Sequence, residues 1–230
     1  AITAGTRAGL QGSASYAGAP TTGIVMNSTG VGEVVESSDK NYPIGSKVLT
    51  QTGWQEYSVQ SPNNLTALRE DVDPSLYLGP LGINGLTAYF GLLDVGQPKE
   101  GETVLVSGAA GSTGSIVAQI AKIKGCRVIG VAGGVEKCKW LTEEVKIDAA
   151  IDYKTANLQE VIPELCPEGI DVIFDNVGGE FLNTSLLSIN QNARVAICGA
   201  ISGYNNEAPA PGPSNYTALL IQRAKKMLIF

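Results

Sequence analysis

The stretch VLVSGAAGSTG, residues 104–114, decides the fold of this chain. It begins as an apolar run, which is typical of a buried strand, and it breaks into a glycine-rich turn. From Ala109 to Gly114 it reads Ala-x-Gly-x-x-Gly, the dinucleotide-binding fingerprint with alanine in place of the first glycine. Gly111 lets the backbone approach a pyrophosphate. Gly114 lets the next helix pack tightly on the strand, so that the phosphates lie over the helix N-terminus.

The residues after the turn favour this interpretation over a tight turn that binds nothing. Gly125 predicts the end of a helix, and 127–132 has the composition of the next buried strand. Apolar residues recur between them at helical spacing: Ile116, Val117, Ile120, Ala121 and Ile123. The sequence thus places the fingerprint in a strand–turn–helix context, which the motif requires.

Length and composition describe an ordinary globular chain. It has 230 residues, 43% of them hydrophobic, and a mean hydropathy of +0.08. The formal net charge is −6 and the pI is about 4.8, which disfavours a nucleic-acid or anionic-membrane surface but allows a local basic phosphate pocket. No apolar stretch is long enough to span a bilayer and nothing resembles a secretory signal, so we expect a soluble, cytoplasmic protein.

The chain contains no histidine, which removes Ser-His-Asp and Cys-His nucleophilic machinery and the nitrogen ligands of most catalytic zinc sites. No Cys-x-x-Cys pair occurs, so we expect no metal site and no disulfide framework. The scattered cysteines are Cys126, Cys138, Cys166 and Cys198. Any reaction at this chain therefore takes its chemistry from a cofactor.

The composition changes near residue 75. Before it, short β-like pieces alternate with glycine, proline and polar clusters, and they predict a small β-rich unit. These pieces are 23–26, 31–36, 46–51 and 54–60. After it, strands alternate with helices, which predicts an α/β fold with one doubly wound parallel sheet. The expected strands are 103–107, 127–132, 149–152, 170–175, 194–198 and 227–230, and the expected helices are 111–124, 136–145, 179–189 and 214–226. We therefore expect two domains, 1–75 and 76–230.

The end of the second strand of the α/β unit favours NADP over NAD. An NAD site offers an acid there to the ribose 2′-hydroxyl, whereas 132–135 reads Ala-Gly-Gly-Val. Lys137 and Lys139 follow, and Lys137 could meet the extra phosphate of NADP. Glu136 weakens this inference, and the alternative is a solvated lysine pair on a surface helix.

Four motifs in order resemble the zinc-independent medium-chain dehydrogenase/reductases, and within them the NADPH-dependent alkenal/enone reductases of the prostaglandin reductase type. They are GINGLTAY (82–89), the 108–114 turn, DNVGG (175–179) and CGAISGYN (198–205). The resemblance runs from about residue 23 to the end. It implies a Rossmann domain at 76–230 and an incomplete GroES-like domain at 1–75. In this family the first β-rich segment is longer, and the chain returns after the last strand of the sheet to complete the GroES-like domain.

The resemblance also implies the cofactor contacts. The 2′-phosphate would meet Lys137 and Tyr153, the ribose would meet Asn176, and Thr87 is a further contact. The pyrophosphate turn contributes Gly111, Ser112, Thr113 and Gly114, and the nicotinamide segment contributes Cys198, Gly199, Ala200, Ile201, Ser202 and Tyr204. From the residues themselves, Asn176 and Cys198 stand at the carboxyl ends of expected strands, whereas a tyrosine that ends a strand, such as Tyr153, is more often half-buried packing.

The resemblance implies hydride transfer from NADPH to the β-carbon of an α,β-unsaturated ketone or aldehyde, with enolate charge building on the carbonyl oxygen. Tyr204 is the candidate catalytic residue that donates to this oxygen. In the alternative, the ribose hydroxyl of the cofactor donates to the carbonyl oxygen, and Tyr204 only packs against the nicotinamide. The expected partner is a small-molecule enone or enal, and a homodimer is one expected assembly. A quinone reductase of the same fold and a non-catalytic NADPH-binding protein are the other interpretations.

Overall fold

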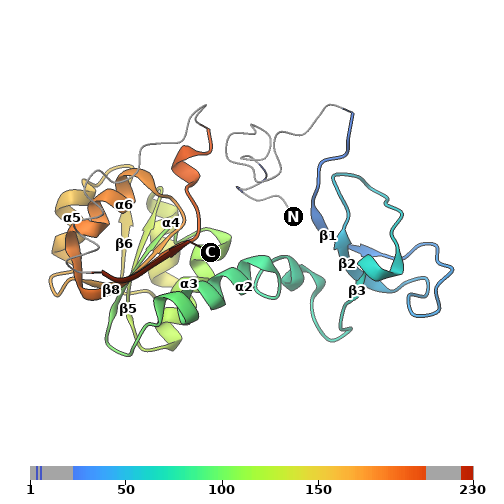
Figure 1. Cartoon of the computed structure of the whole chain (residues 1–230), viewed down its shortest axis with the longest axis horizontal. Coiled ribbons are helices and arrows are strands. Elements are labelled where there is room, and N and C mark those ends of the chain that lie inside the picture. The colour runs from blue at the N-terminus through green and yellow to red at the C-terminus, as the bar shows by residue number, and fades with distance from the viewer. Residues whose placement is uncertain (1–3, 5, 7–22, 206–223, 230) are drawn as a thin grey trace. The chain divides into compact units, whose positions relative to one another are not determined.

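Figure 1 shows the computed structural model, which describes residues 4, 6, 23–205 and 224–229. The chain divides into two compact units, residues 1–84 and 85–230. Each unit has its own sheet.

The small unit contains a three-stranded antiparallel sheet in the order β1-β2-β3. Val48 and Thr50 of the central strand are buried. The elements are β1 (Thr29–Glu33), β2 (Lys47–Gln51), β3 (Thr66–Ala67) and two 3₁₀ helices, η1 (Pro62–Asn64) and η2 (Pro74–Leu78). The expected strands at 23–26 and 54–60 are wrong. Their apolar side chains, including those of Tyr57 and Val59, are exposed, so that no buried face holds either segment in a strand.

The large unit contains one six-stranded sheet, and every neighbouring pair of strands is parallel. The order β6-β5-β4-β7-β8-β9 reverses direction at β4, which is the doubly wound arrangement expected from the sequence. The strands are β4 (Thr103–Ser107), β5 (Arg127–Ala132), β6 (Ala149–Asp152), β7 (Ile170–Asp175), β8 (Ile189–Ile197) and β9 (Ala224–Ile229).

Helices cover both faces of this sheet (Figure 1). Side chains alternate along β4, so that Val104 and Val106 pack on one face and Leu105 packs on the other. The first face is covered by α2 (Ile83–Phe90), η3 (Gly91–Gly96), α3 (Ser112–Ile123) and α4 (Val135–Glu143). The second is covered by α5 (Leu158–Leu165) and α6 (Gly179–Ser185), with the 3₁₀ helices η4 (Leu186–Ser188) and η5 (Ile201–Gly203) completing the elements. The strands β4, β5, β7 and β8 are thus packed between two layers of buried apolar side chains.

A strand forms at each of the six expected positions, although β8 and β9 begin before the expected residues 194 and 227; two helix predictions are corrected and one helix was not predicted. Helix α5 was not among the expected helices; it contains Pro163, and the buried side chains of Leu158 and Ile162 hold one of its faces. The helix expected at 179–189 ends at Ser185, and β8 begins at Ile189. Of the helix expected at 214–226, residues 214–223 lie outside the described residues, and 224–226 pair with β8 as the start of β9.

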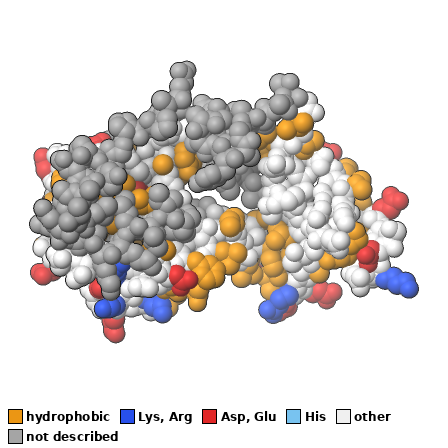
Figure 2. Space-filling model, in the orientation of Figure 1, with side chains coloured by type: hydrophobic (Ala, Val, Ile, Leu, Met, Phe, Trp, Pro, Cys, Tyr) orange, Lys and Arg blue, Asp and Glu red, His pale blue; other side chains and the backbone are white. Residues whose placement is uncertain are grey.

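Figure 2 shows acidic and basic side chains scattered over the visible face of the molecule. Several large apolar side chains are exposed along α2, among them Leu86, Tyr89 and Phe90. Within the described residues, no helix combines the length and the apolar character that crossing a membrane would require.

Candidate dinucleotide-binding site

Most of the predicted site residues lie just beyond the carboxyl ends of the strands of the large sheet. In an open α/β sheet these ends meet at one edge, and ligands bind in the crevice outside it. The turn 108–114 follows β4, residues 133–134 follow β5, Tyr153 follows β6, Asn176 follows β7, and 198–204 follows β8. Thr87 differs, since it comes from the middle of α2 and follows none of these strands.

The turn after β4 has the shape that its glycines predict. Gly108 has a φ of +56°, and Gly111 N–H donates to Gly108 O at 2.8 Å. A Cβ on Gly114 would lie 2.3 Å from Gly108 O, so the third position of the fingerprint requires glycine. Helix α3 begins at Ser112, next to this turn, and the first N–H groups of a helix are the kind of donor that an anion uses.

A network of buried polar groups joins β4 to β7 beside this turn. Ser107 Oγ–H donates to Asp175 Oδ1 at 2.7 Å and accepts from Asn176 N–H at 2.7 Å. The side-chain amide Nδ2 of Asn176 in turn donates to the backbone oxygen of Ser107 at 2.7 Å. Both Ser107 and Asp175 are 0% exposed. The network fixes the Asn176 side chain at the edge of the sheet.

The Asp175 carboxylate accepts hydrogen bonds from uncharged donors. Val177 N–H and Gly178 N–H donate to it at 2.9 and 3.0 Å, in addition to Ser107. Burial raises the pKa of this carboxyl, and the Ser107 hydroxyl and the two N–H groups oppose that rise. Within the described part of the chain, no lysine or arginine forms an ion pair with Asp175. Hydrogen bonds alone therefore compensate the buried charge.

The segment after β8 is fastened to the same network. Cys198 N–H and Gly199 N–H both donate to Asp175 O, at 2.8 and 3.1 Å, and Ser202 Oγ–H donates to Val177 O at 2.6 Å. Tyr204 folds back over this segment, and its hydroxyl oxygen accepts from Ala200 N–H at 3.4 Å. The arrangement brings 198–204 and Asn176 together, as the sequence predicted.

Burial, and to a smaller extent the nearby Asp175 carboxylate, raises the pKa of the Cys198 thiol to about 11. At neutral pH the side chain is therefore an uncharged thiol, which is a poor nucleophile. Its place in the site is that of a packing group.

The end of β5 is shaped by residues from β6. The Tyr153 ring lies against Gly133, where an added Cβ would meet ring atoms at 2.9 and 3.0 Å. Asp152 Oδ1 accepts from Gly134 N–H at 2.8 Å, and Gly134 has a φ of +99°. Lys137 is exposed in the first turn of α4. Sequence reasoning missed Asp152, although its place as the last residue of a strand was a signal.

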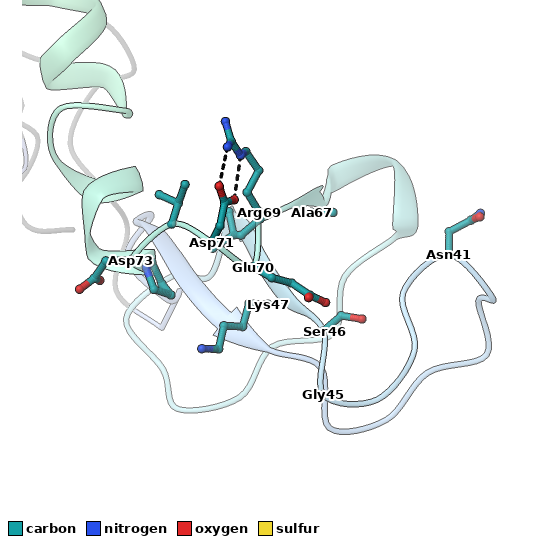
Figure 3. Close-up of a pocket in the computed structure, with 12 residues that line it drawn as sticks. Asn41, Gly45, Ser46, Lys47, Ala67, Arg69, Glu70, Asp71 and Asp73 are labelled. Carbon is teal, nitrogen blue, oxygen red and sulfur yellow. Dashed lines mark hydrogen bonds and ion pairs between the residues drawn. The ribbon is translucent and has the colours of Figure 1, made fainter.

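A separate cavity of about 670 Å³ lies in the small unit, between β2, β3 and the following turn (Figure 3). Lys47, Glu70 and Asp73 line it, together with an exposed ion pair in which Arg69 donates to Asp71 at 2.6 and 3.0 Å. None of the predicted site residues lines this cavity. Its charges are mixed, and we assign it no ligand.

The fold and this edge define a Rossmann-type dinucleotide-binding domain. A family model described as "Zinc-binding dehydrogenase" matches residues 112–226, and one described as "N-terminal domain of oxidoreductase" matches residues 1–68. The chain belongs to the medium-chain dehydrogenase/reductase superfamily and, within it, to the NADP-dependent alkenal and prostaglandin reductases.

Three similar proteins support this family assignment. The chain is 43% identical to NADPH-dependent curcumin reductase of Escherichia coli (strain K12), over 93% of this chain and 62% of the relative. It is 50% identical to prostaglandin reductase 1 of Bos taurus, over 84% of this chain and 60% of the relative. The crystal structure of CurA from Vibrio vulnificus in complex with NADPH has a TM-score of 0.92 at 40% identity, covering 100% of this chain and 69% of that one. The chain thus spans about three fifths of the curated relatives it matches.

The family description mentions zinc, whereas this chain has no histidine. Among the described residues, no group of three or more histidine, cysteine, aspartate or glutamate side chains could hold a metal ion. The expected absence of a metal stays a prediction.

The network predicts that Ser107→Ala destabilises the protein. The change removes a donor from buried Asp175 and the acceptor of the buried Asn176 N–H, so we expect the free energy of unfolding to fall by about 2 kcal/mol. Chemical denaturation measures this. Ser115→Ala is the control, because Ser115 Oγ makes only a 3.4 Å bond to Ser112 O. Equal stability of the two variants would contradict the assigned role of Ser107.

Proposed function

We propose that the protein reduces the carbon–carbon double bond of α,β-unsaturated ketones or aldehydes with NADPH. The observation that carries this proposal is the turn 108–114 opening α3, combined with an acid-free Gly133–Gly134 at the end of β5. The names of the relatives support it, since they are a curcumin reductase and a prostaglandin reductase. The chain's own residues fit the cofactor, because the turn needs glycine at position 114 and leaves a helix N-terminus beside it.

We assign each part of the cofactor to residues along this edge. The turn 111–114 would hold the pyrophosphate, and Lys137 with Tyr153 would hold the 2′-phosphate. Asn176 would bind the ribose, and 198–204 would surround the nicotinamide; Thr87 of α2 is a further proposed contact.

Bound NADPH supplies the hydride that is transferred to the β-carbon of the substrate. The chain must then stabilise the charge that develops on the carbonyl oxygen and see it protonated. Tyr204 is the proposed catalytic residue. Its hydroxyl oxygen already accepts from Ala200 N–H, so the phenolic proton is left to donate to the substrate oxygen. The alternative is that Tyr204 only packs on the nicotinamide and that the ribose hydroxyl donates.

The remaining inferences stay predictions. They are a domain division at 75/76, a cytoplasmic location, no nucleic-acid, membrane or metal partner, and a homodimer. The composition supports the absence of a nucleic-acid partner through the net charge of −6.

The intact protein should oxidise NADPH in the presence of an alkenal or a conjugated enone. Loss of NADPH absorbance, together with identification of the saturated product, tests this. A quinone oxidoreductase would turn over quinones and leave enones unchanged, and a binding protein would retain NADPH without turnover. Either result would overturn the proposal.

Tyr204→Phe keeps the ring and removes the hydroxyl. If that hydroxyl donates to the developing enolate, kcat for enones should fall by about 10² to 10³, as on loss of one oxyanion donor. The dissociation constant of NADPH should change little, since the ring remains. An unchanged kcat would show that the hydroxyl is not the donor.

Lys137→Ala should weaken NADPH binding by about ten- to a hundredfold, because a charged hydrogen bond to the 2′-phosphate contributes about 1.5–3 kcal/mol. NADH lacks this phosphate and should bind almost unchanged. Titration of both cofactors at fixed salt measures the difference. Lys139→Ala is the matched control, since Lys139 lies 3.9 Å from Glu143 on the same helix. Equal losses for both cofactors would assign Lys137 to the fold instead.

A further inference from the structure

An acid reaches the proposed 2′-phosphate end of the site from the neighbouring strand. Asp152 is the last residue of β6, and its Oδ1 atom accepts two backbone N–H groups, Gly134 at 2.8 Å and Lys154 at 3.1 Å. A Rossmann site for NAD has its ribose-binding acid at the end of the second strand, which here is β5. In this chain the acid is on the adjacent strand, and it is bonded to the backbone.

These bonds join the turn after β5 to the turn after β6. Tyr153 N–H donates to Ala132 O at 3.1 Å, and the Tyr153 ring fills the space where Gly133 has no side chain. Gly134 has a φ of +99°, a conformation that L side chains rarely adopt. The two turns are therefore held together by main-chain bonds, a ring contact and the Asp152 carboxylate.

We propose that Asp152 is a positioning residue that gives the site its preference for NADPH over NADH. By holding Gly134 N–H and Lys154 N–H, it keeps the glycine turn open and sets Tyr153 beside the start of α4. The 2′-phosphate would then meet Lys137 and Tyr153 in a pocket already formed. This inference rests on the proposed use of NADPH.

The negative charge of the Asp152 carboxylate would repel the 2′-phosphate of bound NADPH. The bond from Gly134 N–H, and then that from Lys154 N–H, lower the pKa of Asp152, so the group is ionised at neutral pH. Two N–H donors and the nearby Lys154 side chain partly neutralise this charge. The positioning effect should therefore exceed the repulsion, and the two can be separated by mutation.

Two substitutions separate them. Asp152→Asn keeps an oxygen that can accept both N–H groups but removes the charge, whereas Asp152→Ala removes the bonds as well. For Asp152→Ala we expect the NADPH dissociation constant to rise about tenfold, the loss that one or two hydrogen bonds produce, with less than about a threefold change for NADH. Asp152→Asn should bind both cofactors within about threefold of the wild-type chain.

Titration of the 230-residue chain with NADPH and with NADH at fixed salt measures these constants. Denaturation of each variant at the same salt checks that it is folded, and a merely structural role would weaken both cofactors alike. Equal losses for the two cofactors in Asp152→Ala, or an Asp152→Asn variant as weak as Asp152→Ala, would overturn the proposal. Failure of the NADPH use on which this inference rests looks different, since the wild-type chain itself would then bind NADPH no better than NADH, whereas failure of enone reduction alone would leave these dissociation constants unchanged.

Discussion

The hydrogen bond from Ser107 to Asp175 is the interaction on which the site depends. It joins the ends of β4 and β7, the two central strands between which the order of the sheet reverses. The main chain of Asp175 also accepts from the segment after β8, so one residue arranges three strand ends. Burying a carboxylate is costly unless hydrogen bonds compensate it, and here the donors are the Ser107 hydroxyl and the N–H groups of Val177 and Gly178 in the loop after β7.

Two acids thus organise the two ends of the edge in different environments. Asp175 is buried, and burial raises the pKa of its carboxyl. Asp152 lies near the surface, and its bond to Gly134 N–H lowers its pKa. Each carboxylate accepts a backbone N–H group from a glycine in a site turn, Gly178 for Asp175 and Gly134 for Asp152. We regard this as the reason that the glycine-rich edge keeps one shape.

Much of the fold could be predicted because its signals are local. A buried parallel strand is a short apolar run, and the turn after β4 needs glycine for steric reasons within seven residues. Predictions from local sequence signals failed where contacts with distant residues determine the secondary structure. The segment 54–60 has β-like composition but no buried face, and α5 forms despite Pro163 because Leu158 and Ile162 are buried against the sheet. Asp152 was overlooked because its partner Gly134 is 18 residues away.

The sequence by itself determined the alternation of strands and helices, the phosphate turn and the exclusion of histidine chemistry, since these follow from residue type and spacing. The tertiary structure alone decided which polar groups meet. Ser107 and Asp175 are 68 residues apart, and they become neighbours because β4 and β7 pair in parallel. The Tyr153 ring likewise meets Gly133 only through the pairing of β5 with β6. The physical reason is that the order of the strands in the sheet determines these long-range contacts, and this order cannot be deduced from residue spacing along the chain.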